Sequence, residues 1–245
     1  MRYKVVVSYD GSFYFGFQTQ PNHRTVQSEI EKTLLHVYHQ PIKIVASGRT
    51  DALVHAKGQT FHYDSKVIIK VEKLKNVINK HLLNDIRIVS IEEVDDSFHA
   101  RYDVLKKEYR YFISLGDYDV FRQHYVTFFN KKLDMEAIHK ASQYFLGEHD
   151  FRSFTKNKNL KNTVRTIETF DITKQGNEIT IRVVGNGFLH NMVRIIVGAL
   201  LRVGTNKLSP EDIKSILDEK NRVYAPFIAP PQGLVLWNVA YKKDI

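Results

Sequence analysis

The 245-residue chain contains no cysteine. This absence excludes disulfide frameworks, thiol nucleophiles, Cys-ligated zinc and iron–sulfur clusters, and it fits a reducing compartment. Long hydrophobic runs are also missing, since the apolar stretch 195–201 is far shorter than the ~20 helical residues that span a bilayer. The N-terminus lacks the apolar run of a signal peptide. We therefore expect a cytoplasmic protein that does not enter a membrane.

Several motifs of common chemistries are absent as well. The sequence has no G-x-x-x-x-G-K-[ST] phosphate loop, no H-E-x-x-H zinc motif and no G-x-S-x-G nucleophile elbow. The glycines at 185 and 187 lack the third glycine of a dinucleotide-binding fingerprint. Nucleotide hydrolysis, hydride transfer and zinc chemistry thus lose their usual support.

The composition is that of a globular protein, with 43% hydrophobic and 26% charged residues. The formal net charge is +9, and most of the basic excess falls after residue 103. Such an excess is typical of proteins that bind a polyanion. It is equally compatible with an ordinary protein of high isoelectric point, so charge alone does not decide the function.

Periodicity predicts the order of the secondary structure. Apolar residues at helical spacing predict helices over 26–37 and 71–83, and an almost wholly apolar segment predicts a buried helix over 191–203. Alternating patterns predict strands over 2–9, 59–63, 86–94, 106–115, 163–173, 178–184 and 234–241. Because strands and helices mix without strict βαβ alternation, we expect an α+β fold. It would have two α/β subdomains, residues 1–103 and 104–245, built on mostly antiparallel sheets with helices packed on one face.

The segment 47–56 (SGRTDALVHA) combines a carboxylate, a guanidinium and an imidazole among small residues. An Asp beside an Arg stays ionised at neutral pH. Such a carboxylate can act as a nucleophile or stabilise a cationic sugar transition state. A structural loop tied by an Arg–Asp ion pair would use the same residue types. On residue types alone, this structural interpretation is the simpler one.

The segment and its surroundings closely resemble the TruA family of tRNA pseudouridine synthases. The resemblance spans essentially the whole chain, and its specificity comes from many motifs occurring in the family's order. The matching motifs are Tyr9-Asp10-Gly11-Ser12-x-Tyr14-x-Gly16-Phe17-Gln18, Thr25-Val26-Gln27, Gly48-Arg49-Thr50-Asp51-Ala52 with Val54-His55, Phe98-His99-Ala100-Arg101, Tyr109-Arg110-Tyr111, Gly147-x-His149-Asp150-Phe151, Arg165-Thr166-Ile167, Phe188-Leu189-His190-Asn191-Met192-Val193-Arg194, Pro226-Phe227-x-Ala229-Pro230 and Gly233-Leu234.

The resemblance implies an activity and its partners. The family isomerises uridine to pseudouridine at positions 38–40 in the anticodon arm of tRNA, without a cofactor or metal. Its members are homodimers that bind tRNA across both protomers. By resemblance Asp51 is the catalytic nucleophile. The residues implied in substrate binding are Tyr109, Arg49, Arg194, Leu234 and His55.

The resemblance implies a role for each of these residues. Arg49 would pair with Asp51 and help hold the flipped nucleotide, and Arg194 would lie near the same carboxylate. The ring of Tyr109 would stack on uracil, and its hydroxyl could take the C5 proton. Leu234 would line the uracil pocket, and His55 would support the loop. Without the resemblance, Tyr109 and Leu234 would be read as core residues.

A basic stretch supports an RNA surface. Its residues, among which no acidic side chain occurs, are Arg152, Lys156, Lys158, Lys161 and Arg165. Lys and Arg neutralise phosphates and set affinity without reading bases. We therefore expect tRNA to be recognised by shape. A solvated loop is the alternative interpretation for any one of these residues.

One position departs from the family pattern. Leu53 stands where the signature has Gly. If that position needs a positive φ, a Leu there is strained. This departure and the basic excess keep open an RNA-binding module that has lost activity. A cofactor-free nucleoside hydrolase acting through Asp51 is the third hypothesis.

Overall fold

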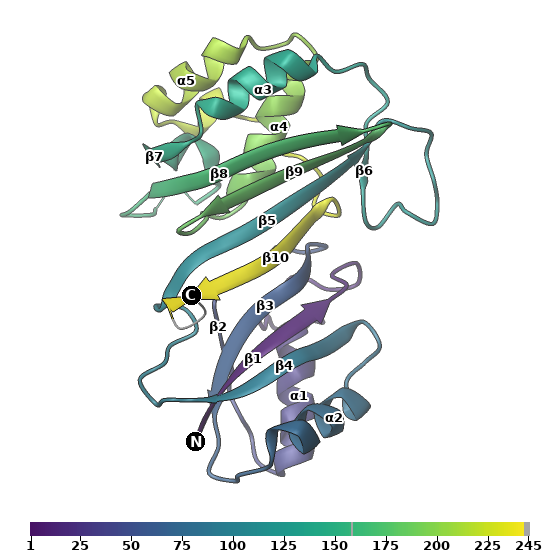
Figure 1. Ribbon diagram of the computed structural model, residues 1–245, viewed down its shortest axis with the longest axis vertical. Coiled ribbons are helices and arrows are strands. Elements are labelled where there is room, and N and C mark those ends of the chain that lie inside the picture. The colour runs from purple at the N-terminus through teal and green to yellow at the C-terminus, as the bar shows by residue number, and fades with distance from the viewer. Residues whose placement is uncertain (158, 243–245) are drawn as a thin grey trace. The chain divides into compact units, whose positions relative to one another are not determined.

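The computed structural model describes residues 1–157 and 159–242, which form two compact units (Figure 1). The first unit is Met1–Leu105 with Val235–Ile245, and the second is Lys106–Leu234. The sequence placed the division at residue 103 and assigned everything after it to the second subdomain. In the structure the last strand belongs to the first unit, because its residues Val235 and Leu236 pair with His55 and Ala56 of that unit.

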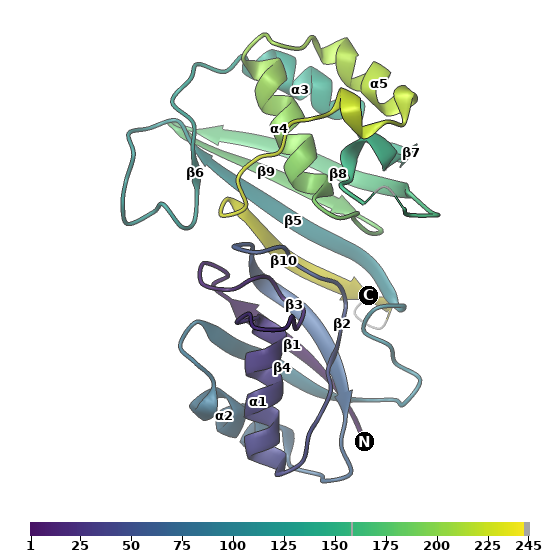
Figure 2. The ribbon, with the colours of Figure 1, turned by 180° about the vertical axis from the view of Figure 1, so that it is seen from behind.

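The first unit is a sheet with helices beside it. Its strand order is β4 (Ile86–Val94), β1 (Arg2–Tyr9), β3 (His55–Asp64) and β10 (Leu234–Tyr241), with the short β2 (Val45–Ala46) also on β3. Strand β1 is antiparallel to both neighbours, whereas β10 runs parallel to β3. Helix α1 (Val26–Tyr38) lies across one face of this sheet (Figure 2), and α2 (Val71–His81) packs against α1 and β4.

The start of α1 follows from its first residues. The Thr25 side chain accepts a hydrogen bond from the Ser28 backbone N–H, and the Ser28 hydroxyl accepts one from the Thr25 N–H. This capping box satisfies two amide groups that a helix N-terminus leaves without partners. Helix α1 then buries Val26, Ile30 and Leu34, which recur every four residues on one face.

Strand β3 begins earlier than the sequence predicted. It starts at His55, four residues before the expected start at residue 59, so His55 lies on a strand and not in the loop. Residues 55–58 are polar or small, so their pattern does not indicate a strand. Gly58 is in fact required by the neighbouring strand, because a Cβ there would lie 2.7 Å from the Trp237 carbonyl oxygen.

The second unit is an antiparallel sheet with three helices. Its strand order is β5 (Val104–Ser114), β9 (Glu178–Gly185), β8 (Val164–Gln175) and β7 (Gly147–Asp150), with β6 (Thr127–Phe128) parallel to β5. Helix α4 (Met192–Gly204) lies over this sheet in Figure 2, and α3 (Met135–Gln143) packs on α4 and α5 (Pro210–Glu219). Two single 3₁₀ turns complete the unit, η1 (Phe151–Phe154) and η2 (Arg222–Tyr224).

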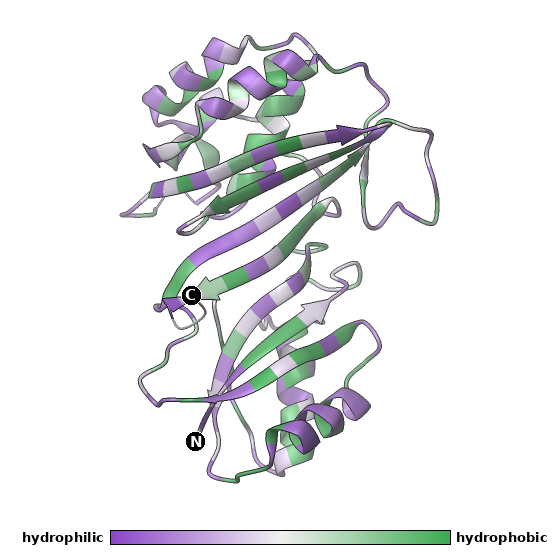
Figure 3. Cartoon of the chain, in the orientation of Figure 1, coloured by the Kyte–Doolittle hydropathy of each residue, from purple (hydrophilic) through white to green (hydrophobic). Residues whose placement is uncertain are grey.

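The predicted buried helix is confirmed in α4, where nearly every side chain from Met192 to Gly204 is buried. Gly204 lets the helix approach α3, since a Cβ at this position would lie 2.5 Å from Ile138 Cδ1. By contrast, the visible turns of α2 are largely hydrophilic in Figure 3. The two units together confirm the predicted α+β class with mostly antiparallel sheets. Over the described ranges, no helix combines the length and the apolar character that crossing a bilayer requires.

Candidate active site

Asp51 opens a tight turn immediately before β3. The Val54 N–H donates to the Asp51 carbonyl oxygen at 3.2 Å, which closes the turn over Ala52 and Leu53. Leu53 has φ +65°, so the position where the family signature has Gly does adopt the left-handed region. The expected strain at this Leu is therefore present, and its side chain is 42% exposed. Asp51 itself is half-buried.

The motif near the N-terminus holds this turn in place. The Phe17 N–H of this motif donates to the Thr50 carbonyl at 3.1 Å. The Tyr14 carbonyl of the motif accepts from the Leu53 N–H at 3.3 Å. Gly16 lies directly against the turn with φ +88°, and a Cβ there would lie 2.7 Å from the Thr50 oxygen. Only glycine fits such a position, because both the conformation and the space exclude a side chain.

His55 directly follows the turn and contacts the motif near the N-terminus. It is buried, and its Nδ1 lies 3.0 Å from the Gly11 backbone nitrogen, which donates to it, and 3.1 Å from Asp10 Oδ1. Asp10 Oδ1 in turn accepts from the backbone N–H and hydroxyl of Ser12. Gly11 packs against the Val54 backbone so closely that a Cβ would overlap it. The role that the resemblance gives His55, support of the loop, stays a prediction.

The other end of the segment is anchored to β3. The Ser47 hydroxyl donates to Gln59 Oε1 at 2.6 Å, and Gln59 Nε2 donates to the Gly48 carbonyl at 3.0 Å. Gln59 is fully buried, so this amide cannot exchange its partners for water. With both ends fixed, the Asp51 carboxylate is carried by a preorganised backbone, as a nucleophile or an electrostatic stabiliser requires.

Arg49 lies in the same segment with an exposed side chain. Its expected pairing with Asp51 stays a prediction. The two residues flank Thr50, whose hydroxyl is hydrogen-bonded to Tyr9 at 2.8 Å inside the fold. Arg49 therefore presents its charge to solvent, where a phosphate could meet it.

The remaining residues that are predicted to bind substrate lie in the second unit. Tyr109 is buried on β5 and meets the Phe188 ring edge-on, with centroids 5.1 Å apart. Arg194 is half-buried on α4, and its Nε donates to the Ala229 carbonyl at 2.9 Å. Leu234 is 5% exposed at the start of β10. Their convergence on Asp51 stays a prediction.

Tyr111 lies two residues after Tyr109 on β5 and was not among the predicted site residues. Its hydroxyl donates to the Pro230 carbonyl at 2.7 Å and is hydrogen-bonded to Thr127 at 2.6 Å. Burial raises the pKa of Tyr111, whereas the charge of Arg194 acts in the opposite direction. Tyr111 thereby fixes the segment that holds Arg194. The signal was its position two residues after Tyr109, which puts both on one side of a strand.

The segment 226–230 lies directly against α4. A Cβ at Gly198 would lie 3.0 Å from the Ile228 nitrogen, so the glycine allows the chain to lie on the helix. Ala229 N–H donates back to the Arg194 carbonyl at 2.9 Å, which completes a reciprocal pair with the side-chain bond. The orientation of the Arg194 guanidinium is thus set by backbone groups.

The predicted RNA-binding stretch is mostly at the surface. Arg152, Lys156 and Lys161 are exposed, and Lys158 lies outside the described residues. Arg165 is half-buried, because its stem lies along Gly187 and its Nη1 donates to the Val164 carbonyl at 2.5 Å. Burial lowers the pKa of its guanidinium.

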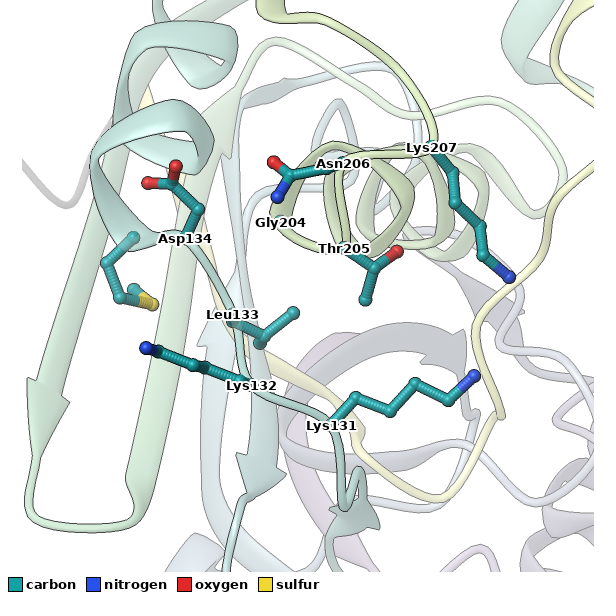
Figure 4. Close-up of a pocket in the computed structure, with 9 residues that line it drawn as sticks. Lys131, Lys132, Leu133, Asp134, Gly204, Thr205, Asn206 and Lys207 are labelled. Atoms are coloured by element: carbon teal, nitrogen blue, oxygen red, sulfur yellow. The ribbon is translucent and has the colours of Figure 1, made fainter.

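The second unit has an open cavity of about 710 Å³, which is lined by none of the predicted site residues (Figure 4). Its basic lining comes from Lys131, Lys132 and Lys207, of which Lys131 and Lys207 extend to the same side in the figure. The one carboxylate in the lining, Asp134, caps α3 by accepting from the Ala137 N–H. The cavity thus offers cations but no group poised for acid–base chemistry. Across the described part of the chain, no cluster of three or more His, Asp or Glu is arranged to hold a metal ion.

A family profile and the named relatives agree on one family. The family profile described as tRNA pseudouridine synthase matches residues 5–103 and 141–242, so Asp51 and Arg194 fall within the match and Tyr109 does not. A protein of Bacillus cereus named tRNA pseudouridine synthase A 1 is 49% identical over 245 residues, covering 99% of both chains. One of Exiguobacterium sp. named tRNA pseudouridine synthase A is 46% identical, covering 99% of this chain and 98% of that protein. A solved Cbf5-Nop10-Gar1 complex matches at 13% identity with a TM-score of 0.36, covering 81% of this chain and 54% of that one.

Proposed function

Because this chain belongs to the TruA family of tRNA pseudouridine synthases, and is thus an isomerase acting on uridine in tRNA, we propose that it modifies positions 38–40 with Asp51 as the nucleophile. The observation that carries the proposal is the Asp51 turn. Its backbone is fixed by the opening motif on one side and by Gln59 on the other. A carboxylate held in this way needs little reorganisation during a reaction.

The chemistry is a balanced isomerisation. The N1–C1′ bond of uridine breaks, the uracil turns over, and a new bond forms between C5 and C1′. The C5 proton is lost, and N1 regains a proton, so the RNA keeps its mass. Asp51 either attacks C1′ directly or assists departure of the base through a glycal, and both routes need its ionised form.

The other residues have proposed roles in the same reaction. The ring of Tyr109 is the surface on which uracil lies, and its hydroxyl receives the C5 proton. Arg194, which is oriented by Ala229, balances the charge of the carboxylate. Leu234 contacts the apolar edge of the base. His55 acts through the turn and not on the substrate, since it is buried against Gly11.

The proposed partner is tRNA, bound by a homodimer in the cytoplasm and recognised by shape. The exposed charges of Arg152, Lys156 and Lys161 support contacts to phosphates, which carry no base information. Such contacts release counterions, so binding should weaken steeply with salt. The free energy of these contacts would offset the few kcal/mol needed to take a uridine out of its stack.

The test is release of tritium from tRNA labelled at uridine C5. Asp51→Ala and Asp51→Asn should abolish release, because neither side chain can carry the negative charge. The control is Asp218→Asn, which neutralises an exposed carboxylate at the end of α5 and should leave release unchanged. Undiminished release by Asp51→Ala would refute the role of Asp51.

Two further measurements separate the alternatives. Salt-sensitive tRNA binding without any release, even at high protein concentration, would identify an RNA-binding module. Free uracil among the products would identify a hydrolase, since isomerisation leaves no free base. A panel of tRNAs with a single uridine at position 38, 39 or 40 tests the proposed positions directly, and release from none of them would contradict the assignment.

A further inference from the structure

Three large apolar side chains are exposed on the Asp51 turn and on the segment that is hydrogen-bonded to it. Phe13 is 64% exposed, Phe15 is 53% exposed and Leu53 is 42% exposed. The Leu53 N–H donates to the carbonyl of Tyr14, which stands between the two phenylalanines in the chain. The backbone therefore brings all three residues to the turn that carries Asp51. Together they are called the apolar rim.

The rim is built on a fixed backbone. The Phe15 N–H donates to the Arg24 carbonyl at 2.9 Å, and the Phe15 carbonyl accepts from Gln20 Nε2 at 2.8 Å. The Phe15 ring is stacked on the His23 ring, with centroids 4.1 Å apart and planes inclined by 23°. The His23 ring thus covers one face of the Phe15 ring and restrains its orientation. A ligand that stacks on the other face would therefore cost little side-chain entropy of Phe15.

Leu53 adds a second argument. A non-glycine residue in the left-handed region costs of order 1–3 kcal/mol, and such strain tends to cluster at functional sites. At Leu53 the strained backbone carries a large apolar side chain that is exposed beside a carboxylate. Because the Leu53 side chain is exposed, packing within the folded chain does not explain why a leucine occupies this strained position. Contact with a bound molecule would explain it.

The occupant follows from chemistry. Exposed aromatic faces are the surfaces on which unpaired nucleobases stack, and stacking tolerates any base because every base has a π-face. When a uridine leaves its stack, the base next to it loses one stacking neighbour. We propose that the apolar rim holds the base adjacent to the target uridine, with Phe15 as the stacking face and with Phe13 and Leu53 at its edges.

The proposal deepens the proposed function and rests on it, because it names what binds beside the reacting uridine. Positions 13 and 15 are open positions of the opening motif, and Leu53 departs from the family signature. The rim is therefore a feature of this chain and not of the motif. It acts on binding and positioning, and it takes no part in the bond exchange.

The experiment couples a change in the protein to a change in the RNA. A tRNA with the C5 label at one target uridine is prepared in three forms: intact, with an abasic residue on the 5′ side of that uridine, and with one on the 3′ side. Tritium release gives kcat/KM for the wild type, Phe15→Ala, Phe15→Trp and Phe121→Ala. Phe121 is 88% exposed on another loop and serves as the matched aromatic control.

On intact tRNA, Phe15→Ala should lower kcat/KM by about 5- to 150-fold, the range measured when one stacked base loses its aromatic partner. Phe15→Trp, which keeps a stacking face, and Phe121→Ala should stay near the wild type. On one of the two abasic tRNAs the wild type should be slowed by a similar factor. Phe15→Ala should then cause little additional loss, because the shared contact is already gone.

Equal losses from Phe15→Ala on all three tRNAs would overturn the proposal, since the ring would then act without touching a neighbouring base. Unchanged kcat/KM for Phe15→Ala on intact tRNA would overturn it as well. Failure of the proposed function gives a different result, because the wild type itself would then release no tritium.

Discussion

Replacement of Gly16 by alanine should displace the turn that carries Asp51. Gly16 has φ +88°, and the added Cβ would lie 2.7 Å from the Thr50 carbonyl oxygen and 3.2 Å from the Asp51 carbonyl carbon. Neither atom is the end of a flexible side chain. The Thr50 carbonyl accepts the Phe17 N–H, and the Thr50 hydroxyl is held by Tyr9, so relief requires movement of the backbone that carries the carboxylate.

The expected cost has two parts. A left-handed alanine costs roughly 1–2 kcal/mol relative to glycine. Overpacking against a fixed backbone adds about 1–3 kcal/mol. A shift of about 1 Å in a catalytic group can cost ~100-fold in rate, so we expect kcat/KM to fall by that order. Gly16→Ala should thus lower both stability, by about 2–5 kcal/mol, and activity.

Gly176→Ala provides the control for backbone strain. Gly176 lies in the turn between β8 and β9 with φ +57°, and a Cβ there would meet no atom of the described residues within 4 Å. This variant should lose only the strain part, about 1–2 kcal/mol, and keep its activity. Chemical denaturation compares the two stabilities, and tritium release from labelled tRNA compares the two rates.

The comparison can refute the reasoning in two ways. If Gly16→Ala is no less stable than Gly176→Ala, the close approach to Thr50 does not constrain the turn. If Gly16→Ala is destabilised but turns over tRNA at the wild-type rate, the position of the turn does not control catalysis. A second substitution at Thr50 is not needed to distinguish these outcomes.

Three further predictions use other parts of the molecule. Burial lowers the pKa of His62 to about 4, and its Nδ1 accepts the Ala100 N–H, so the fold favours the neutral ring. The stability that the neutral ring contributes is complete above pH ~6.5 and falls by up to about 3 kcal/mol as the pH drops to ~4. Urea denaturation should find this loss reduced in His62→Gln. Leu53→Gly should raise the melting temperature by a few degrees, because it relieves about 1 kcal/mol of strain, yet it should lower kcat/KM on tRNA; a lower melting temperature would contradict the strain. Combined replacement of Lys156 and Lys161 by Gln should reduce the slope of log Kd against log salt by up to about 2, and an unchanged slope would remove both from the RNA contact.

Local patterns predicted much of the fold. Strand β4 has the predicted bounds, and α1 begins at the predicted residue 26. These features depend on neighbours in the sequence. The start of β3 at His55 could not be read in this way, because Gly58 and Lys57 resemble a loop until the approach of β10 is known. The pairing of that strand with the first unit is likewise a long-range property.

The site was predictable to a different degree. Residue types alone left Asp51 in a structural loop, and only the order of many motifs made it a candidate nucleophile. The conditional strain at Leu53 is confirmed by its φ of +65°. The purpose of Gly11 and Gly16 was hidden, because their close contacts are with Val54 and Thr50, far along the chain. Spacing within a motif does not reveal a partner at that separation.

The pairing of β3 with β10 has a consequence for biosynthesis. His55 and Ala56, which follow the Asp51 turn, lie opposite Val235 and Leu236. A ribosome adding ~5–20 residues per second needs roughly 10 to 40 s to travel from one partner to the other. Throughout that interval the start of β3 is an open edge of the nascent first unit, because β2 pairs only near the other end of the strand. An open edge is the kind of surface that invites wrong pairing or a chaperone. The turn that holds the carboxylate gains its last neighbouring strand only when translation reaches that distant segment.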